Sequence, residues 1–358
     1  MPTFESAKEP KRVLITGGMG FIGSHLSEAL LAQGHQVTVI DNLSTGRFDN
    51  IQHLVAQPRF SYIVDDITHG AVLNRLVGEC DLVYHLASAV GVKLIVENPL
   101  QSIETIVMGT EAVLKAALEH RVQVLIASTS EVYGKGTRIP FAEDDDVVLG
   151  PTRNSRWSYA ASKMVDEFMG LAYFRQKGLP VVIFRLFNTV GPRQTGQYGM
   201  VIPRFVQAAL QGKPLTVYGD GEQSRSFLHV KDAVKGIMGL ADCPEAVGQV
   251  FNVGSTEQVT ILELAHKVLH SVDPSYIPCG NGQHPTSDNG QIVFVPYTEA
   301  YAEGFEDMRR RVPDISKIRL YTGWEPQHVL EEILRDVIAY MAPGMVTQLA
   351  MEKIAVAA

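Results

Sequence analysis

The sequence predicts an α/β fold: a doubly wound parallel sheet, followed by a smaller mixed α/β domain in the C-terminal half. Apolar strand-like runs alternate with amphipathic helical patterns through the first half of the 358 residues. Such alternation implies a parallel sheet, because parallel neighbours need a crossover connection that is usually a helix. After about Asn188 the pattern changes to short mixed segments rich in proline and glycine, which predicts a second domain.

The predicted strands are short apolar runs bounded by turn residues. In chain order they are Arg12–Thr16, Gln36–Ile40, Phe60–Val64, Leu82–His85, Val122–Ala127 and Val181–Arg185. The amphipathic stretches that predict helices include Ser24–Gln33, Pro99–His120 and Ser158–Lys177. A later run, Val250–Val253, is expected to return to the same sheet, and Gly280–Gly290 predicts a loop.

A glycine-dense turn after the first strand is the most informative motif. Gly18, Gly20 and Gly23 fit G-x-G-x-x-G, and Gly17, Gly20 and Gly23 fit the looser G-x-x-G-x-x-G. Glycines here permit positive φ and let the backbone approach a pyrophosphate, which binds the free N–H groups of the following helix. Taken alone, the turn also fits an ordinary strand–helix junction.

The second strand decides in favour of a dinucleotide. Asp41 directly follows Gln36–Ile40, where a carboxylate meets the adenosine ribose hydroxyls. The same charge would repel a 2′-phosphate, which favours NAD over NADP. We therefore predict a Rossmann-type NAD-binding domain over residues 1–187 with a returning strand near 249–254, a second domain over 188–343 and a tail over 344–358.

Composition excludes several classes of function. A formal net charge of −8 argues against binding to nucleic acid or to a membrane surface. The three cysteines, Cys80, Cys243 and Cys279, are scattered without metal-ligand spacing, which suits a reduced cytosol. Met1–Arg12 lacks the apolar core of a signal peptide, and no apolar run approaches the ~20 residues of a membrane span. We expect a cytoplasmic protein without a metal, nucleic-acid or membrane partner.

Three polar clusters lie at or beside predicted strand ends, where parallel sheets bind ligands. They are Ser128–Glu131, Tyr159-x-x-x-Lys163 on a predicted helix, and Leu186–Arg193. The spacing of Tyr159 and Lys163 puts both side chains on one helix face. Alone, this pair also fits a half-buried tyrosine beside a solvated lysine. Its position after a dinucleotide turn and a Ser/Thr cluster predicts catalysis instead.

These motifs resemble those of the extended short-chain dehydrogenase/reductases, and more narrowly the NAD-dependent nucleotide-sugar epimerases, dehydratases and decarboxylases. The resemblance runs from about residue 13 to about residue 326 and implies a UDP-sugar substrate bound mainly by residues 188–343. It also implies a homodimer formed through the helices Pro99–His120 and Ser158–Lys177. The NAD-binding residues it implies are Gly17, Gly20, Phe21, Ile22, Gly23, Asp41, Asn42, Ser44, Thr45, Gly46, Asp66, Ile67, Leu86, Ala87, Ser88, Tyr159 and Lys163.

The resemblance implies that Tyr159 takes a proton from a sugar hydroxyl. A phenol with a pKa near 10 is a base at neutral pH only when nearby positive charge lowers that pKa. Lys163 and the oxidised nicotinamide are expected to supply the charge, and Thr129 to share the hydroxyl proton while C4 is oxidised. With Ser130 and Glu131 these residues form the predicted catalytic set. The family returns the hydride later, so that no net redox occurs.

Three reactions can follow C4 oxidation: 4-epimerisation, 4,6-dehydration by loss of water across C5–C6, and decarboxylation of a uronic acid. Glu131 favours the last two, because a 4-epimerase needs no second acid–base group there. A carboxylate that only caps a nearby amide also fits this position. Gln223–Phe227 resembles the Arg-small-Phe of UDP-glucuronate decarboxylases, and Arg156–Tyr159 resembles the Arg-Trp-x-Tyr of UDP-apiose/xylose synthase.

We therefore predict decarboxylation of UDP-glucuronate to a UDP-pentose of the UDP-xylose type. A UDP-glucose or UDP-glucuronate 4-epimerase is the second hypothesis, and an NDP-sugar 4,6-dehydratase is the third. A non-catalytic NAD-sensing protein is a more remote alternative, because a sensor has no need to keep Thr129, Glu131, Tyr159 and Lys163.

The resemblance also implies how the nucleotide is held. Guanidinium groups suit phosphate oxygens. The resemblance implies that Arg225, Arg311 and the Asn188 amide contact the diphosphate, and that the segments 201–205 and 216–218 enclose uracil. The implied substrate-binding residues are Asn188, Arg193, Val201, Arg204, Thr216, Tyr218, Arg225 and Arg311. Arg309 and Arg310 fit a solvated basic face instead, and His85 fits a hydrogen-bonded histidine at a strand end.

Two positions depart from the family pattern. UDP-xylose synthases show Tyr-Asp-Glu-Gly-Lys-Arg around the catalytic pair, whereas this chain has Tyr159–Met164 as Tyr-Ala-Ala-Ser-Lys-Met. Ile106 stands where the family has asparagine before Val-x-Gly-Thr. Because isoleucine cannot form a hydrogen bond, polar support beneath the active site is expected to come from water or another group.

Overall fold

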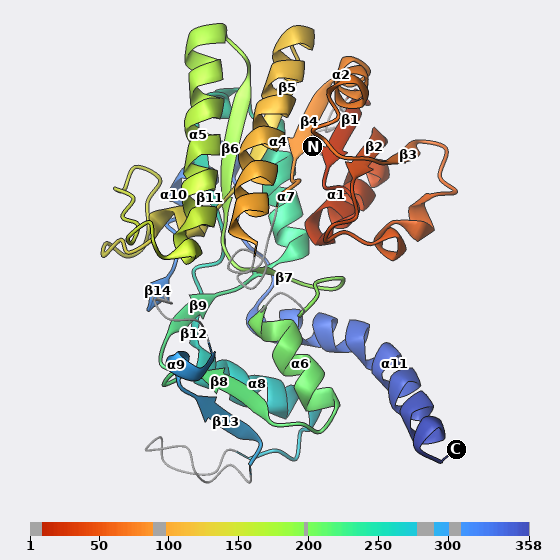
Figure 1. Ribbon diagram of the computed structural model, residues 1–358, viewed down its shortest axis with the longest axis vertical. Coiled ribbons are helices and arrows are strands. Elements are labelled where there is room, and N and C mark those ends of the chain that lie inside the picture. The colour runs from red at the N-terminus through yellow and green to blue at the C-terminus, as the bar shows by residue number, and fades with distance from the viewer. Residues whose placement is uncertain (1–8, 89–97, 197–199, 278–289, 301–308, 358) are drawn as a thin grey trace, which may run out of the picture.

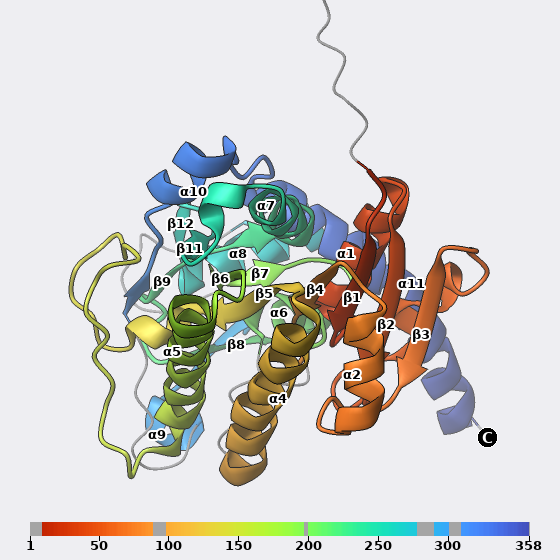
Figure 2. The same ribbon diagram turned by 90° about the horizontal axis from the view of Figure 1, so that it is seen from above.

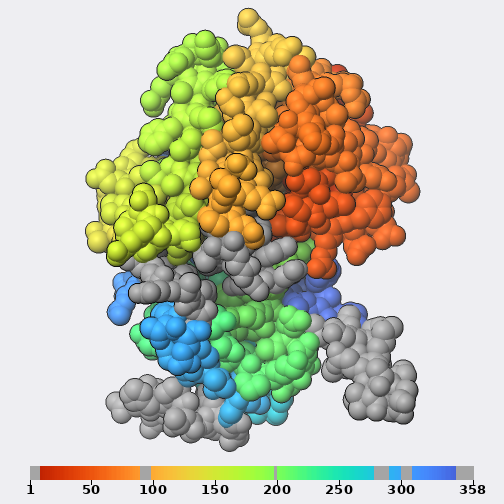
Figure 3. All heavy atoms as spheres, in the orientation of Figure 1, coloured from red at the N-terminus to blue at the C-terminus, as the bar shows by residue number. Residues whose placement is uncertain are grey.

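The computed structural model describes residues 9–88, 98–196, 200–277, 290–300 and 309–357. Figure 1 shows two lobes, one above the other, with the N-terminus on the upper lobe and the C-terminus at the end of a helix beside the lower one. In the space-filling view (Figure 3) the upper lobe, coloured red to yellow-green, is the broader of the two.

A seven-stranded parallel sheet forms the centre of the upper lobe. Its strands are β1 (Arg12–Thr16), β2 (Gln36–Asp41), β3 (Phe60–Val64), β4 (Leu82–His85), β5 (Gln123–Thr129), β6 (Val181–Leu186) and β11 (Val250–Val253). They lie in the order β11-β6-β5-β4-β1-β2-β3. The strand order reverses at β1, between β2 and β4, and sheets of this kind bind ligands at such a switch point. The returning strand that the sequence predicts is therefore the outermost strand beside β6.

Helices cover both faces of the sheet. One face packs against α1 (Phe21–Ala32), α7 (Val230–Ala241) and α10 (Ser316–Thr322), and the other against α2 (Gly70–Gly78), α4 (Pro99–His120) and α5 (Ser158–Lys177). Figure 2 shows α2, α4 and α5 along one side and α7 and α10 along the opposite side. Strands that are buried on both faces read as continuous apolar runs, which is the pattern of this sequence.

Element boundaries differ from the predictions where polar residues continue a ladder. β5 extends two residues past the predicted end, because Ser128 and Thr129 pair with Arg185 and Leu186 of β6. β2 likewise includes Asp41. α1 begins at Phe21 rather than at the predicted Ser24, directly after the glycine turn. Polar strand ends carry no apolar signal, so a prediction from hydrophobic pattern stops too early there.

The lower lobe is a mixed α/β layer with its own apolar core. Its helices are α6 (Val201–Leu210), α8 (Ile261–Val272), α9 (Tyr297–Ala300) and α11 (Leu330–Ala357). Its short strands are β8 (Leu215–Tyr218) with β13 (Ile292–Val295), and β9 (Ser224–Ser226) between β12 (Gln258–Thr260) and β14 (Arg310–Arg311). A further pair, β7 (Thr189–Val190) and β10 (Leu228–His229), joins the lobes.

Short 3-10 helices complete the described elements: η1 (Phe48–Asn50), η2 (Gln52–Leu54), η3 (Ser130–Tyr133), η4 (Ser155–Trp157) and η5 (Pro244–Ala246). The loop predicted over 280–290 lies outside the described residues except for its last position. None of the helices in the described ranges combines the length and apolar character that a bilayer crossing requires.

The chain crosses between the lobes more than once. α7 and α10 belong to the second half of the sequence, yet Ile237 and Ile318 from these helices are buried in the same core as Val39 of the sheet. The lobe boundary is thus not a single point along the chain, and the edge of the upper lobe is completed by residues beyond 188.

Candidate active site

A cavity of about 730 Å³ lies at the carboxyl ends of the strands and is lined by both lobes. Most of the predicted site residues line it, whether they were assigned to the cofactor, to catalysis or to the substrate. Gly46 and Thr216 are absent from its described wall. The sheet edge and the lower lobe therefore bring most of the sequence-predicted residues around one space.

The glycine turn forms the part of this wall that fits a pyrophosphate. Gly17 has φ +70°, and a Cβ there would lie 2.8 Å from the amide nitrogen of Ala87. A Cβ on Gly23 would lie 2.4 Å from the carbonyl oxygen of Gly17. No side chain among the described residues caps the start of α1 at Gly20. The first N–H groups of α1 thus remain available to phosphate oxygens.

Asp41 is fixed at the end of β2 by backbone donors. Its Oδ2 accepts a hydrogen bond from the Met19 N–H at 3.0 Å, and its Oδ1 accepts one from the Leu43 N–H at 2.8 Å. Burial raises the pKa of this carboxyl, although the two backbone bonds oppose the rise. A Cβ on Gly46 would lie 2.8 Å from either carboxylate oxygen, so Gly46 acts by leaving room for Asp41. A carboxylate fixed in this way can accept hydrogen bonds from the ribose diol of NAD.

The adenine end of the same wall is polar. Asn42 Nδ2 donates to Asp66 Oδ2 at 2.8 Å, which joins the ends of β2 and β3. At the opposite end the buried Ser88 Oγ has no hydrogen-bond partner among the described residues. The remaining predicted cofactor residues on this wall are Phe21, Ile22, Ser44, Thr45, Ile67 and Leu86.

The predicted catalytic residues come from the end of β5, from η3 and from the first turns of α5. Tyr159 and Lys163 are one helical turn apart on α5 and both face the cavity. Thr129 caps η3, since its Oγ1 accepts the Glu131 N–H at 3.2 Å, and Ser130 is buried beside it. Burial raises the pKa of the Tyr159 phenol, and the Glu131 charge raises it further, while a hydrogen bond with Thr129 opposes the rise.

Glu131 lies between two arginines. Its Oε2 accepts a hydrogen bond from Arg156 Nη1 at 2.7 Å, and its Oε1 accepts one from Arg311 Nη1. Burial acts to raise the pKa of Glu131, but Arg156 and Arg311 lower it to about 2. Glu131 is therefore ionised at neutral pH, and the three side chains carry a net positive charge.

Two features of this cluster go beyond the sequence predictions. Arg156 is not among the predicted site residues, although the Arg-Trp-x-Tyr spacing before Tyr159 contains it. Arg311 was assigned to the diphosphate, and the structure places it on Glu131 and on the Asn188 amide oxygen. Residues 131 and 311 are too distant in sequence for any local pattern to pair them.

The remaining predicted substrate residues surround the lower part of the cavity. Arg225 on β9 is paired in register with Arg311 on β14, and Asn188 Nδ2 donates to the Ser226 carbonyl at 2.8 Å. The Arg204 guanidinium lies 4.3 Å from the Tyr218 ring centroid and donates to the Thr216 carbonyl at 3.0 Å. Thr216 thus supports Arg204 through its backbone. Val201, at the start of α6, lines the same region.

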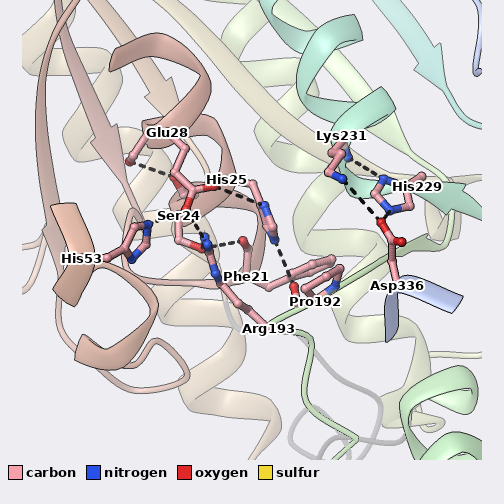
Figure 4. Close-up of polar contacts among 12 residues, drawn as sticks. Phe21, Ser24, His25, Glu28, His53, Pro192, Arg193, His229, Lys231 and Asp336 are labelled. Atoms are coloured by element: carbon pink, nitrogen blue, oxygen red, sulfur yellow. Dashed lines mark hydrogen bonds and ion pairs between the residues drawn. The ribbon is translucent and has the colours of Figure 1, made fainter. Parts of the chain in front are cut away.

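Arg193 joins the loop after β7 to α1 (Figure 4). Its guanidinium donates to Ser24 Oγ at 3.1 Å and to the Glu28 carboxylate, which also contacts His53. From the same helix, His25 Nε2 lies 3.0 Å from the Pro192 carbonyl oxygen. Arg193 lines the cavity, but its charge is already matched by Glu28, so the geometry gives it a bracing role between the lobes.

A second bracing contact in Figure 4 lies where α7 begins. Asp336 of α11 contacts His229 at 3.3 Å and Lys231 at 3.4 Å. Burial lowers the pKa of His229 to about 4, with His328 and Lys231 acting in the same direction. His229 also accepts the Lys231 N–H at 3.0 Å as the cap of α7.

A dinucleotide cradle whose open end meets a partly buried tyrosine and a buried lysine defines an NAD-dependent enzyme. Residues 14–337 match the GDP-mannose 4,6 dehydratase family. The UDP-N-acetyl-α-D-glucosaminuronate decarboxylase of Bacillus cytotoxicus is 42% identical over 334 residues, which cover 92% of this chain and 97% of that protein. UDP-glucuronic acid decarboxylase 1 of Xenopus tropicalis is 39% identical over 337 residues, which cover 94% of this chain and 73% of that protein.

A solved structure is similar over nearly the same extent. The UDP-glucuronic acid 4-epimerase from Bacillus cereus, in complex with UDP-glucuronic acid and NAD, has a TM-score of 0.79 and 28% identity, with 92% of this chain and 98% of that chain covered. The chain therefore belongs to the GDP-mannose 4,6 dehydratase family. This confirms the predicted α/β fold, the predicted family resemblance and NAD as the cofactor.

Proposed function

We propose that the protein decarboxylates a UDP-linked uronic acid, and that UDP-glucuronate and its 2-acetamido counterpart are its candidate substrates. The observation that carries this proposal is the Arg156–Glu131–Arg311 cluster beside Tyr159. Its net positive charge suits a substrate carboxylate, which a neutral hexose lacks. Two relatives that cover most of the chain are decarboxylases of UDP-uronates by name.

The chemistry divides among the chain's own residues. Tyr159 accepts the C4 hydroxyl proton, with Thr129 sharing that hydrogen bond, and Lys163 supplies positive charge that favours the phenolate. NAD supplies the hydride acceptor for C4 when it is bound. The C4 ketone then stands β to the C6 carboxylate, so the C5–C6 bond can break with release of CO₂ while its electron pair moves into the ketone.

The ionised Glu131 has a supporting role in the same step. Developing charge on the C4 oxygen is stabilised by the Tyr159 and Thr129 hydroxyls, which point to the same space. Glu131 keeps Arg156 and Arg311 in place without adding a proton donor, because its low pKa leaves it charged at neutral pH. We further propose that Asn188, Arg204, Tyr218 and Arg225 hold the nucleotide diphosphate.

The test is the product of purified, NAD-loaded protein with each uronate. We expect CO₂ release and a nucleotide sugar lighter by one CO₂, measured by mass spectrometry. A product of unchanged mass with inverted C4 would instead establish a 4-epimerase, the second candidate, which the likeness to the Bacillus cereus epimerase favours. Comparison of kcat/KM for the two uronates decides the substituent at C2.

We also propose a homodimer formed through α4 and α5. These helices pack side by side on one face of the sheet (Figure 2) and expose large apolar side chains: Leu100 and Met108 on α4, and Val165 and Phe168 on α5. Apolar exposure of this kind marks contact surfaces. Phe168→Glu is expected to give a monomer by light scattering; a dimer that survives this charge at its centre would place the interface elsewhere.

A cytoplasmic location is the remaining part of the proposal. Cys80 and Cys243 are buried and unpaired, and burial raises the pKa of the Cys80 thiol to about 12. Unpaired thiols suit a reducing compartment. Fractionation of the native host with antibody detection tests this location.

A further inference from the structure

Lys163 is held from below by a fully buried carboxylate. Its Nζ donates to Asp166 Oδ2 at 3.0 Å, and the two residues are 2% and 0% exposed. The other carboxylate oxygen, Oδ1, is buried with no hydrogen-bond partner among the described residues. A buried carboxylate with a spare oxygen is costly in free energy unless a positive charge lies against it. Lys163 is that charge.

A chain of buried polar groups leads from Asp166 to the glycine turn. His85 Nε2 lies 3.0 Å from Thr110 Oγ1, and His85 Nδ1 lies 2.8 Å from Thr16 Oγ1. Thr16 Oγ1 in turn accepts the Ala87 N–H at 3.2 Å. The Thr110 hydroxyl favours the charged form of Asp166 and so acts to lower the pKa of that carboxyl. All of these side chains are buried, so solvent does not compete for them.

One arrangement of protons that fits these hydrogen bonds is the following. Since the Ala87 N–H donates to Thr16, the Thr16 hydroxyl proton is free to be donated to His85 Nδ1. Burial lowers the pKa of His85 to about 3, so its ring is neutral and Nε2 carries the proton toward Thr110. The Thr110 side chain acts on the Asp166 carboxylate by favouring its charged form.

These buried polar groups show what can replace the asparagine that the family has at the position of Ile106. Ile106 is buried on α4 one turn before Thr110 and offers no polar atom there. The polar support beneath the active site is instead provided by Thr110 on the same helix and by Asp166 on α5.

We propose that Asp166 is the positioning residue of the catalytic lysine: it fixes the Lys163 ammonium on the cofactor side of Tyr159 and sets the charge of the Tyr159–Lys163 pair. This inference rests on the proposed roles of Tyr159 and Lys163. Thr110 and His85 hold the carboxylate in place, and Thr16 connects this support to the turn that receives the pyrophosphate.

The electrostatic consequence has a definite sign. A negative charge makes every neighbouring group hold its proton more tightly, so its removal makes each one lose its proton at lower pH. Asp166 raises the pKa of Tyr159, in addition to burial and Glu131. The other groups that face this cluster are Thr129, Arg311, Glu167 and His85. None of them changes in an Asp166 variant, so the whole pH profile is expected to move in one direction.

The test replaces the charge and keeps the shape. In Asp166→Asn we expect both limbs of the pH profile of kcat to move to lower pH by about one unit, with KM changed less than threefold. Asp232→Asn is the matched control, because Asp232 is a fully buried carboxylate of the upper lobe that accepts hydrogen bonds from residues 327 and 328. It should lower thermal stability and leave the pH profile in place. Should Asp166→Asn fail to fold, Asp166→Ala removes the same charge without added volume.

A second measurement separates this inference from the proposed function. Phenolate absorbance, taken as the difference between each protein and its Tyr159→Phe form, follows Tyr159 ionisation without turnover, both with and without NAD. Asp166→Asn should lower the pH at which that phenolate forms. An unmoved phenolate titration in a folded, NAD-binding variant overturns the role of Asp166. Turnover that persists in Tyr159→Phe overturns the proposed function instead, whatever the titration shows.

Discussion

Glu131 and Asp166 are two carboxylates whose charges both act on Tyr159, and their surroundings shift their pKa values in opposite directions. Two arginines lower the pKa of Glu131 to about 2, whereas burial raises the pKa of Asp166 against the opposing effect of one lysine and one hydroxyl. Glu131 pairs with two cations, Arg156 and Arg311, whereas Asp166 pairs with Lys163. The same chemical group thus serves a cation-rich substrate pocket in one place and a neutralised support in the other.

The phenol of Tyr159 gives the largest expected effect. Tyr159→Phe removes the proposed proton acceptor, which both carboxylates influence, so kcat should fall by about 10³-fold, within the usual range for general acid–base groups. NAD content, measured after denaturation of the purified protein, should not change. Wild-type turnover in this variant would show that neither carboxylate acts through Tyr159.

Removal of the charge on the arginine side comes next. Glu131→Gln leaves Arg156 and Arg311 without their shared anion, and kcat for decarboxylation should fall by roughly 10²-fold. A UDP-glucose 4-epimerase binds no substrate carboxylate and should tolerate the change, so retained activity with C4 inversion would count against the proposed reaction. Assays of CO₂ release and of sugar configuration on the same sample distinguish these outcomes.

The low pKa of Glu131 predicts how the unfolding free energy changes in acid. A folded-state pKa of about 2 for Glu131 lies below its ordinary value of 4.5, so the stability it contributes is present above pH 4.5 and is lost as the pH falls through that range toward 2. Between pH 5 and pH 3 the wild type should lose about 2 kcal/mol more unfolding free energy than Glu131→Gln. Urea unfolding at several pH values measures this difference; parallel curves would mean that the two arginines do not hold Glu131 ionised.

An exposed ion pair gives the smallest expected effect. Lys267 and Glu331 form an ion pair between α8 and α11, and both side chains are about half exposed. Lys267→Met should change the unfolding free energy by less than about 1 kcal/mol and leave kcat unaltered. A larger loss would show that burial is not what distinguishes the two catalytic-site carboxylates from those at the surface.

Local pattern was sufficient for much of the fold. The bounds of α4 and α5 match the prediction residue for residue. α4 begins at Pro99, and the residues that follow the two helices, Arg121 and Gly178, are left-handed. The glycine turn could be assigned to a dinucleotide because close approach of the backbone to the cofactor requires glycine. Asp41 could be assigned because it directly follows the second strand. The polar end of β5 could not be predicted, because its pairing with β6 is a contact between segments that are distant in sequence.

The substrate side was less predictable for a physical reason. The Glu131–Arg311 pair joins η3 to β14, and the Lys163–Asp166 support depends on His85 and Thr110 from two other elements. Such contacts are set by how layers stack rather than by spacing along the chain. The sequence predicts Arg311 as a phosphate-binding residue and His85 as a hydrogen-bonded histidine. It does not predict that Arg311 pairs with Glu131, or that His85 contacts Thr16 and Thr110.

The late position of β11 has a consequence for how the protein is made. Synthesis delivers the cofactor cradle first, by Ser88, but the outermost strand of the sheet only with Val250–Val253, and Arg311 later still. Until those residues leave the ribosome, β6 is an uncovered edge and Glu131 has one of its two arginine partners. A nascent chain can therefore form its NAD-binding turn well before it can form a complete active site, and protection from aggregation is needed most during that interval.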